Sequence, residues 1–138
     1  MKQEDSFSES AIRKTFEMTK REAVLSYGLS LPDTYQDAPF HDENWQLVRV
    51  KGNKKVFLWT YERNGNVCIN IKVNSEWRDF WRNTYESVLP GYHQNKEHWN
   101  TVILDGSVPT EEIKRKSLAS VELMQEINGF VNVDLMNP

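Results

Sequence analysis

The side chains most able to do chemistry lie close together, in the stretch from Leu89 to Gly106. Two histidines, His93 and His98, follow a Pro-Gly turn there, and His41 lies in an earlier polar segment. Three imidazoles could bind zinc or another divalent metal if folding brought them together. No neighbouring cysteine or carboxylate completes a recognised metal motif, so we expect no metal site. The simpler interpretation is that one histidine bonds a loop carbonyl and the other packs beside Trp99.

Nucleophilic catalysis has equally little support in the sequence. The single cysteine, Cys68, would need a lowered pKa and a neighbouring base to act as a nucleophile. Ser117 and Ser120 lack the glycine-flanked turn of a hydrolase nucleophile, and the chain has no glycine-rich phosphate loop. We therefore expect a protein that is not an enzyme and that needs no cofactor.

The formal net charge of −3 conceals an uneven distribution. Residues 1–43 and residues 73–138 each carry a net charge of −4, whereas residues 44–72 carry +5. The basic residues of this middle block are Arg49, Lys51, Lys54, Lys55, Arg63 and Lys72. A local basic surface can attract polyanions even on an acidic protein. The alternative is that the lysines only guard exposed strand edges against pairing with other sheets.

The elements that would position these cations form a predicted antiparallel meander. Alternating apolar residues and β-branched side chains predict strands over residues 45–51, 56–63 and 66–73, with a further strand over 99–104. Asn-Gly is typical of the two-residue turn of a β-hairpin, because both positions need a positive φ. The two turns of the meander are Gly52-Asn53 and Asn64-Gly65.

Helices are predicted on both sides of this meander in the sequence. The first begins near Ser8 and starts afresh near Thr19, where residues 19–22 have the Thr-x-x-Glu form of a capping box. Gly28 and then Pro32 are expected to stop it. The last helix is expected to run to about Ile127 and to end at Gly129.

A helix of a different kind is predicted after Asn74, which can cap its first turn. Its large rings recur at positions i, i+3, i+4 and i+8, which places them on one broad face. A stripe of this spacing normally packs into the core, and we expect it to do so here. The rings belong to Trp77, Phe80, Trp81 and Tyr85.

The charge layout and the hairpins together suggest a hypothesis about function. Lys51, Lys54 and Lys55 cluster at one hairpin turn, and Arg63 borders the next. Two adjacent tips of this kind could straddle DNA and contact its phosphates, with Lys96 adding a contact from the 91–98 loop. Because no set of side chains is arranged to read base edges, binding would be weak, salt-sensitive and sequence-independent.

The aromatic surplus favours a different hypothesis, a module that binds a protein or a small ligand. Sixteen aromatic residues, five of them tryptophan, are many for the core of one small domain. Rings left exposed near the Pro-Gly turn would mark an interaction patch. The residues of this candidate interaction loop are Tyr92, His93, Asn95, His98 and Trp99.

Several short motifs occur in a characteristic order along the chain. They are Phe16-Glu17-Met18-Thr19-Lys20-Arg21-Glu22, Leu29-Ser30-Leu31-Pro32-Asp33-Thr34, Ala38-Pro39-Phe40, Lys51-Gly52-Asn53-Lys54-Lys55, Ile69-Asn70-Ile71-Lys72 and Pro90-Gly91-Tyr92-His93-Gln94-Asn95-Lys96-Glu97-His98-Trp99-Asn100-Thr101. Together, from about Met18 to Met124, they resemble the MmcQ/YjbR family of small bacterial proteins. The resemblance implies a frataxin-like (CyaY-like) two-layer α+β sandwich, an antiparallel sheet with helices on one face. It also implies DNA binding through a double wing of β-hairpins, and it brings no established enzymatic activity.

Length and hydropathy complete the expectations. A chain of 138 residues predicts one domain, which we place at residues 18–127 between an N-terminal extension (1–17, partly helical) and a C-terminal tail (128–138). The apolar runs are too short to span a bilayer and the polar N-terminus does not read as a signal peptide, so we expect no membrane partner. With a single cysteine, a cytoplasmic location is the natural expectation.

Overall fold

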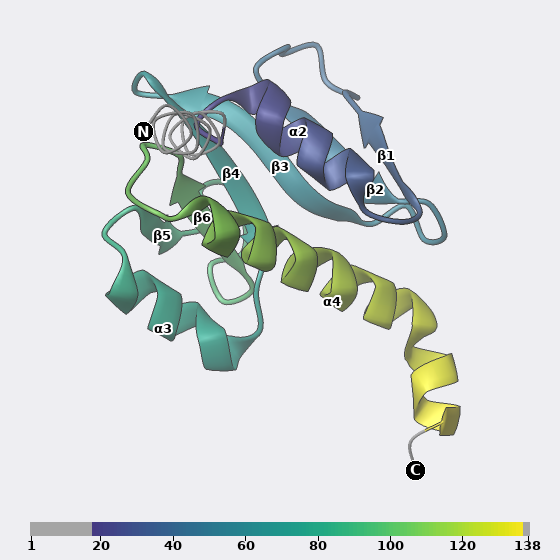
Figure 1. Ribbon diagram of the computed structural model, residues 1–138. Helices are drawn as coiled ribbons and strands as arrows, with labels where there is room; N and C mark the ends of the chain where they lie inside the picture. Colours follow the sequence, from purple (N-terminus) through teal and green to yellow (C-terminus); the bar gives the residue numbers. More distant parts are fainter. Residues whose placement is uncertain (1–17, 137–138) are drawn as a thin grey trace, which may run out of the picture.

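The structure, a computed structural model, describes the backbone of residues 18–136 and the side chains of residues 18–125. The strands of its sheet are Thr34–Asp37 (β1), Gln46–Val50 (β2), Val56–Arg63 (β3), Asn66–Lys72 (β4), Val88–Pro90 (β5) and Trp99–Ile103 (β6). They form one six-stranded antiparallel sheet in the order β1-β2-β3-β4-β6-β5 (Figure 1). The expected first helix near Ser8 and the N-terminal extension lie outside the described residues.

Three described helices pack on one face of this sheet: α2 (Arg21–Ser30), α3 (Ser75–Thr84) and α4 (Thr110–Met136). Helix α2 packs on β1, β2 and β3, helix α4 crosses β2, β3 and β4, and helix α3 contacts β5 and β6 (Figure 1). This arrangement is an α+β sandwich, and the expected fold class is confirmed.

The core lies between the sheet and helices α2 and α4. Alternate residues of the central strands point at the helices and are almost fully buried, and each such branched side chain contributes about 1.5–3 kcal/mol. Gly28 lets α2 approach closely, because a Cβ there would lie 3.3 Å from Val48 Cγ2. The buried side chains of this core include Val24, Val48, Leu58, Ile69, Ile71, Val102, Val121 and Met124.

The central strands agree with their sequence prediction to within about one residue at each end, and the edge strands do not. No strand was predicted at β1, whose segment is rich in proline, aspartate and asparagine. None was predicted at β5, which has only three residues and runs into the Pro-Gly turn. Both edges pair through their backbones with a better-defined neighbour, β2 or β6, and such pairing leaves little trace in the side-chain pattern.

Two helix boundaries also differ from their predictions. Lys20 occupies the N-cap of α2 and the helix starts at Arg21, two residues after the expected Thr19. Helix α4 continues through Gly129 to Met136, so the predicted end at Gly129 is wrong. One glycine within a helix costs only about 1 kcal/mol relative to alanine, which is too little to end a helix by itself.

Candidate functional site

The face of the sheet opposite the helices, called here the open face, carries a buried hydrogen-bond network. Tyr61 donates its hydroxyl hydrogen to Asn70 Oδ1 at 2.7 Å, and Thr101 Oγ1 donates to the same oxygen at 2.6 Å. Asn70 Nδ2 donates to the Tyr92 carbonyl at 2.7 Å, and the Tyr92 N–H donates to Thr101 Oγ1 at 2.8 Å. Burial raises the pKa of Tyr61 to about 12, so the phenol keeps its proton and remains a donor at neutral pH. We call this set the open-face network.

The aromatic surplus noted in the sequence is largely stacked on this face. The Trp45 ring stacks on Tyr61 at 4.1 Å between centroids and on Tyr92 at 6.3 Å. The exposed Phe40 stacks on Trp59 at 6.0 Å. Buried Trp59 Nε1 is one donor here without a hydrogen-bond partner among the described residues. The rings therefore cover the open face much as a second layer would.

The predicted interaction loop is bound into the fold at both ends. Trp99 is only 9% exposed, and Tyr92 is half-buried in the open-face network and ring stack. Asn95 accepts the backbone N–H of Trp99 at 3.0 Å and of His98 at 3.1 Å, while its side chain accepts that of Glu97. His93, Asn95 and His98 remain exposed, although the His93 ring is packed against Tyr92 at 4.0 Å between centroids. The two ends of the loop thus hold it in the fold, while its middle stays open to solvent.

The predicted cations do not gather on one surface. The hairpin turn at residues 51–55 and the turn at Asn64-Gly65 lie at opposite ends of β3, whose eight residues span roughly 25 Å. The expectation that the two tips are adjacent is therefore wrong, because consecutive turns of a meander alternate between the ends of a sheet. Arg63 lies at the far end, over the Tyr92 ring at 3.9 Å. Arg49 is neutralised by Asp37, at 2.8 Å between Nε and Oδ2.

One end of the sheet nevertheless remains basic. Lys72 ends β4 beside the start of β3, where Lys55 precedes the strand. Burial, and then the neighbouring Lys55 ammonium, lower the pKa of Lys72. Its ammonium lies 5.6 Å from the centroid of the Trp99 ring. The exposed Lys51 and Lys54 lie in the adjoining turn, whereas Lys96 is exposed in the 91–98 loop.

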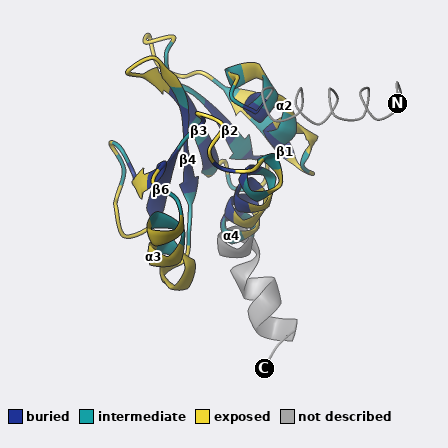
Figure 2. Cartoon of the chain, turned by 60° about the vertical axis from the view of Figure 1, so that its left-hand side comes forward, coloured by how far each residue is buried: buried dark blue, intermediate teal, exposed yellow. Residues whose placement is uncertain are grey.

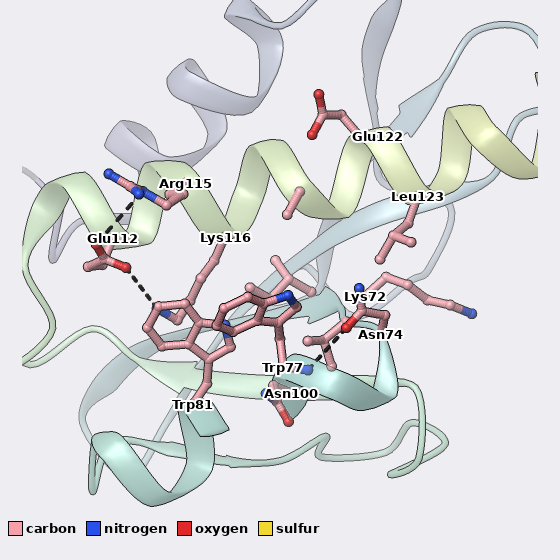
Figure 3. A pocket seen from close by; sticks show the side chains of 13 residues that line it. Lys72, Asn74, Trp77, Trp81, Asn100, Glu112, Arg115, Lys116, Glu122 and Leu123 are labelled. Carbon is pink, nitrogen blue, oxygen red and sulfur yellow. Dashed lines mark hydrogen bonds and ion pairs between the residues drawn. The ribbon is translucent and has the colours of Figure 1, made fainter. Parts of the chain in front are cut away.

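A second candidate site lies on the helix side of the sheet, in a groove of about 490 Å³ between α3 and α4 (Figure 3). Helix α3 forms one wall with its tryptophans, and α4 forms the other. The end of β4 and one residue of β6 form the floor. The lining residues are Ile71, Lys72, Val73, Asn74, Trp77, Trp81, Asn100, Glu112, Arg115, Lys116, Ala119, Glu122 and Leu123.

The aromatic stripe is core only in part: Trp81 and Tyr85 pack against the core, whereas the prediction is wrong for Trp77 and Phe80. Trp77 is 49% exposed and Phe80 is 50% exposed, and every residue of α3 is at least partly open to solvent (Figure 2). The periodicity identified the face correctly, but the helix lies over the short strands β5 and β6 at one side of the sheet, which cannot cover it. The Trp77 and Trp81 rings, 6.1 Å apart between centroids, instead form a wall of the α3–α4 groove.

The groove contains a buried ammonium group. Lys116 is 5% exposed, and its Nζ lies 3.2 Å from the centroid of the Trp81 ring and 3.8 Å from Glu112 Oε2. Neither Nζ nor Oε2 has a hydrogen-bond partner within the described part of the chain, and both atoms are buried. Burial lowers the pKa of Lys116 to about 8, against the opposing effect of the Glu112 carboxylate.

Sequence reasoning missed this pair. Glu112 and Lys116 are four residues apart on a helix, a spacing that normally indicates a solvated surface ion pair. Only the position of α3, which brings the Trp81 ring over the lysine, makes the ammonium buried. The signal that could have indicated the site is the aromatic stripe itself, since four large rings exceed what two short strands can cover.

The remaining chemical candidates have ordinary surroundings. Burial raises the pKa of Cys68, which disfavours the reactive thiolate. Among the described residues, no group of three or more His, Cys, Asp or Glu side chains is arranged to hold a metal ion. Within the same range, no helix combines the length and the apolar character needed to cross a membrane.

Comparison with known proteins places this geometry in a family. The family model described as YjbR matches residues 29–116. The chain belongs to the YjbR family. The matched range of the YjbR model includes the whole open-face network and ends at Lys116.

Relatives and solved structures agree with this assignment to YjbR. The chain is 44% identical over 107 residues to protein YyaQ of Bacillus subtilis, covering 70% of this chain and 90% of YyaQ. It is 30% identical over 90 residues to YjbR of Escherichia coli K12, covering 65% of this chain and 74% of that protein. The crystal structure of Deinococcus radiodurans DR2400 is 28% identical with a TM-score of 0.73, covering 80% of this chain and 81% of that one.

Proposed function

We propose that this YjbR-family protein is a binding protein rather than an enzyme, and that the α3–α4 groove binds a small, planar, largely apolar ligand. The observation that carries this proposal is the buried Lys116 ammonium, which has no hydrogen-bond partner among the described residues and lies on the α4 wall of a groove whose other wall is tryptophan. Binding pockets typically combine an apolar lining with a few convergent polar groups, and this groove has that composition.

The free-energy cost of leaving buried polar atoms without hydrogen bonds supports a ligand-binding role for this pair. A buried donor or acceptor left without a hydrogen bond costs about 1–3 kcal/mol, and a charged group costs more. Lys116 Nζ and Glu112 Oε2 are two such atoms facing one another. The fold obtains an ion pair and a cation–π contact from this arrangement but leaves both atoms without a hydrogen bond, whereas a ligand that supplies the missing partner recovers that cost on binding.

The tryptophans provide the apolar part of the site. Trp77 presents about half of its surface to solvent at the groove, and Trp81 lies beside it over Lys116. An offset-stacked aromatic pair contributes about 0.5–1.5 kcal/mol beyond the area that it buries. A ligand ring stacked on this wall would gain that energy and would shield the ammonium further from water.

Indole is a suitable neutral probe, because it is planar, small and uncharged. For a molecule of this size we expect a Kd on the order of 1 mM, measured by isothermal titration calorimetry. Trp77→Ala should weaken binding about 10-fold. Phe40→Ala is the matched control, since Phe40 is also 49% exposed but lies on the open face. Equal losses in both variants, or binding that only Phe40→Ala weakens, would contradict the proposal.

The second candidate function is weak, sequence-independent DNA binding at the basic end of the sheet. It is favoured by one observation: none of the four lysines there forms an ion pair with a carboxylate of the described residues. The contact would come from one end of the sheet and not from two adjacent wings. The four residues are Lys51, Lys54, Lys55 and Lys72.

Fluorescence anisotropy with a labelled duplex tests this second function. Four phosphate contacts predict a slope of about −3 to −4 for log K against log salt. The double substitution Lys54→Met/Lys55→Met should abolish binding, whereas Arg63→Met at the opposite end of β3 should leave it unchanged. Absence of binding at ~10 µM protein and low salt would exclude the idea, because non-specific binders reach Kd values of about 10⁻⁴–10⁻⁶ M even at physiological salt.

A further inference from the structure

We propose that the ligand of the α3–α4 groove carries a neutral hydroxyl group on its ring, and that this hydroxyl lies between Lys116 Nζ and Glu112 Oε2. The inference rests on the proposed function, and it specifies the chemical class of the ligand: a hydroxylated aromatic or similarly planar molecule. It excludes ring carboxylates and ring amines as preferred ligands of the same groove.

The spacing of the two atoms suits a bridging oxygen. Nζ and Oε2 are 3.8 Å apart, which is too far for a direct hydrogen bond and close enough for an ion pair. An oxygen placed about 2.8 Å from each atom forms a closed triangle with them. Arg115 Nε lies 3.8 Å from the other carboxylate oxygen, Oε1, so Oε2 is the oxygen left for a ligand.

Hydrogen-bond chemistry then selects the group. Lys116, when protonated, can only donate, and the Glu112 carboxylate can only accept. A hydroxyl accepts from the first and donates to the second. A ring carboxylate would satisfy the ammonium but would face the Glu112 carboxylate, and a ring amine would satisfy the carboxylate but offer the ammonium little. Among simple ring substituents, hydroxyl is the one that matches both.

The Trp81 ring must turn aside for the ligand to reach the pair. It covers the ammonium at 3.2 Å, and Figure 3 shows the Lys116 side chain reaching from α4 to this ring while Arg115 points away from the groove. Trp81 is partly buried and its ring also packs against the edge of the core, so the ligand ring has to replace that contact when Trp81 turns aside. The ligand ring takes its place over Lys116, and the cation remains covered by an aromatic face.

Four probes with one scaffold test the inference: indole, 5-hydroxyindole, 5-aminoindole and indole-5-carboxylate. In calorimetric titrations at pH 7, 5-hydroxyindole should bind about 10-fold tighter than indole, because two hydrogen bonds to buried charged groups form. The amine and the carboxylate should bind no tighter than indole. Equal affinities for indole and 5-hydroxyindole would overturn the inference and leave the proposed groove standing. Failure of indole itself to bind would remove the proposed function as well.

Variants of the pair provide a readout that a structural role would not produce. Glu112→Gln replaces an acceptor with an amide that can also donate, so indole-5-carboxylate should become the preferred probe. Lys116→Met should abolish the preference for 5-hydroxyindole while retaining binding of indole. The matched controls on the same helix are Glu111→Gln and Lys114→Met, which lie outside the groove and should leave the order of affinities unchanged. An unchanged order in Glu112→Gln would overturn the inference.

Discussion

The open-face network and the α3–α4 groove are built from similar side chains but differ in whether their polar atoms are hydrogen-bonded. Each places polar groups beside aromatic rings, on opposite faces of the sheet. On the open face, the amide of Asn70 joins three partners, so the side chains and the loop backbone satisfy one another. In the groove, Lys116 Nζ and Glu112 Oε2 face one another without a hydrogen bond to any described residue. A satisfied network stabilises a fold, and an unsatisfied pair beside open space is a place for a ligand.

The two regions should therefore respond to substitution with opposite signs. Removing a member of the open-face network leaves other buried groups without partners and destabilises the protein. Removing the groove ammonium relieves a cost and stabilises it, at the expense of binding. Such a trade between stability and function is common at binding sites, where unfavourable groups are retained for their ligand.

The largest effect is expected for Asn70→Ala. This substitution leaves the Tyr61 hydroxyl, the Thr101 hydroxyl and the Tyr92 carbonyl without their shared partner, which predicts a loss of about 3–5 kcal/mol in the free energy of unfolding. Urea denaturation measures it. Asn66→Ala, on the exposed start of the same strand, is the control and should change stability by less than about 0.5 kcal/mol. Similar values for the two variants would show that the network is not structural.

The loop attached to this network supplies the next prediction. A Cβ on residue 91 would lie 2.7 Å from Trp99 Cβ and 2.9 Å from the Trp99 carbonyl oxygen. Backbone and side chain would both have to move, so Gly91→Ala should lower the free energy of unfolding by about 2–3 kcal/mol. The exposed His98 of the same loop gives the comparison, since His98→Ala should cost much less. If the two variants lower the melting temperature equally, the close approach of Gly91 to Trp99 does not contribute to stability.

In the groove, Lys116→Met should raise stability at neutral pH. The pKa of Lys116 is lowered from its ordinary value of 10.5 to about 8 in the folded protein. Between these two pH values the unfolded chain binds more protons than the folded protein. The free energy of unfolding of the wild type therefore rises with pH across this window and is lowest below it. Met removes the penalty of burying the ammonium but also takes the cation away from Glu112 Oε2, so the net gain at pH 7 should be at most about 1 kcal/mol and should shrink towards pH 10.

The control for this pH dependence is Lys114→Met on the same helix, whose ammonium lies 5.7 Å from the centroid of the Tyr27 ring and outside the groove. It should change stability little at either pH. Urea denaturation of both variants at pH 7 and pH 10 makes the comparison. A Lys116→Met protein that is less stable than the wild type at pH 7 would show that the buried ammonium is structural.

The smallest effect on stability is expected for Trp77→Ala. Because half of this side chain is already in solvent, its removal should cost less than about 1 kcal/mol. Trp45→Ala, which removes the ring stacked on Tyr61 at 4.1 Å, should cost about 2 kcal/mol. Thermal melts that rank the two tryptophans the other way would mean that α3 is anchored through Trp77 and that the groove wall belongs to the core.

The sequence was most informative where the alternation of side chains and the conformation of the turn indicated the same strands. The alternation of residues 66–73 and the Asn64-Gly65 turn were enough to predict β3 and β4 closely, because one face of these strands is buried. The family resemblance, carried by the Pro90–Thr101 motif, was also confirmed. Edge strands β1 and β5 escaped prediction because their pairing is a property of the backbone and of their neighbours.

The candidate sites were predicted less well, for a topological reason. The basic block was read correctly from residues 44–72, but charge in sequence says nothing about which end of a strand each turn occupies. Arg63 and Lys55 are close in sequence and lie at opposite ends of β3. The burial of Lys116 could not be predicted from its neighbours in sequence, because it depends on the ring of Trp81, more than thirty residues away.

The most direct test uses the five tryptophans as reporters of where a ligand binds. Their side-chain N–H signals in a ¹⁵N NMR spectrum can be assigned by single Trp→Phe substitutions and followed during a titration with 5-hydroxyindole. We predict that Trp77 and Trp81 shift in a saturable manner while Trp45 and Trp59 stay in place. Shifts confined to Trp45 and Trp59 would place the ligand on the open face and contradict the assignment of the groove as the binding site.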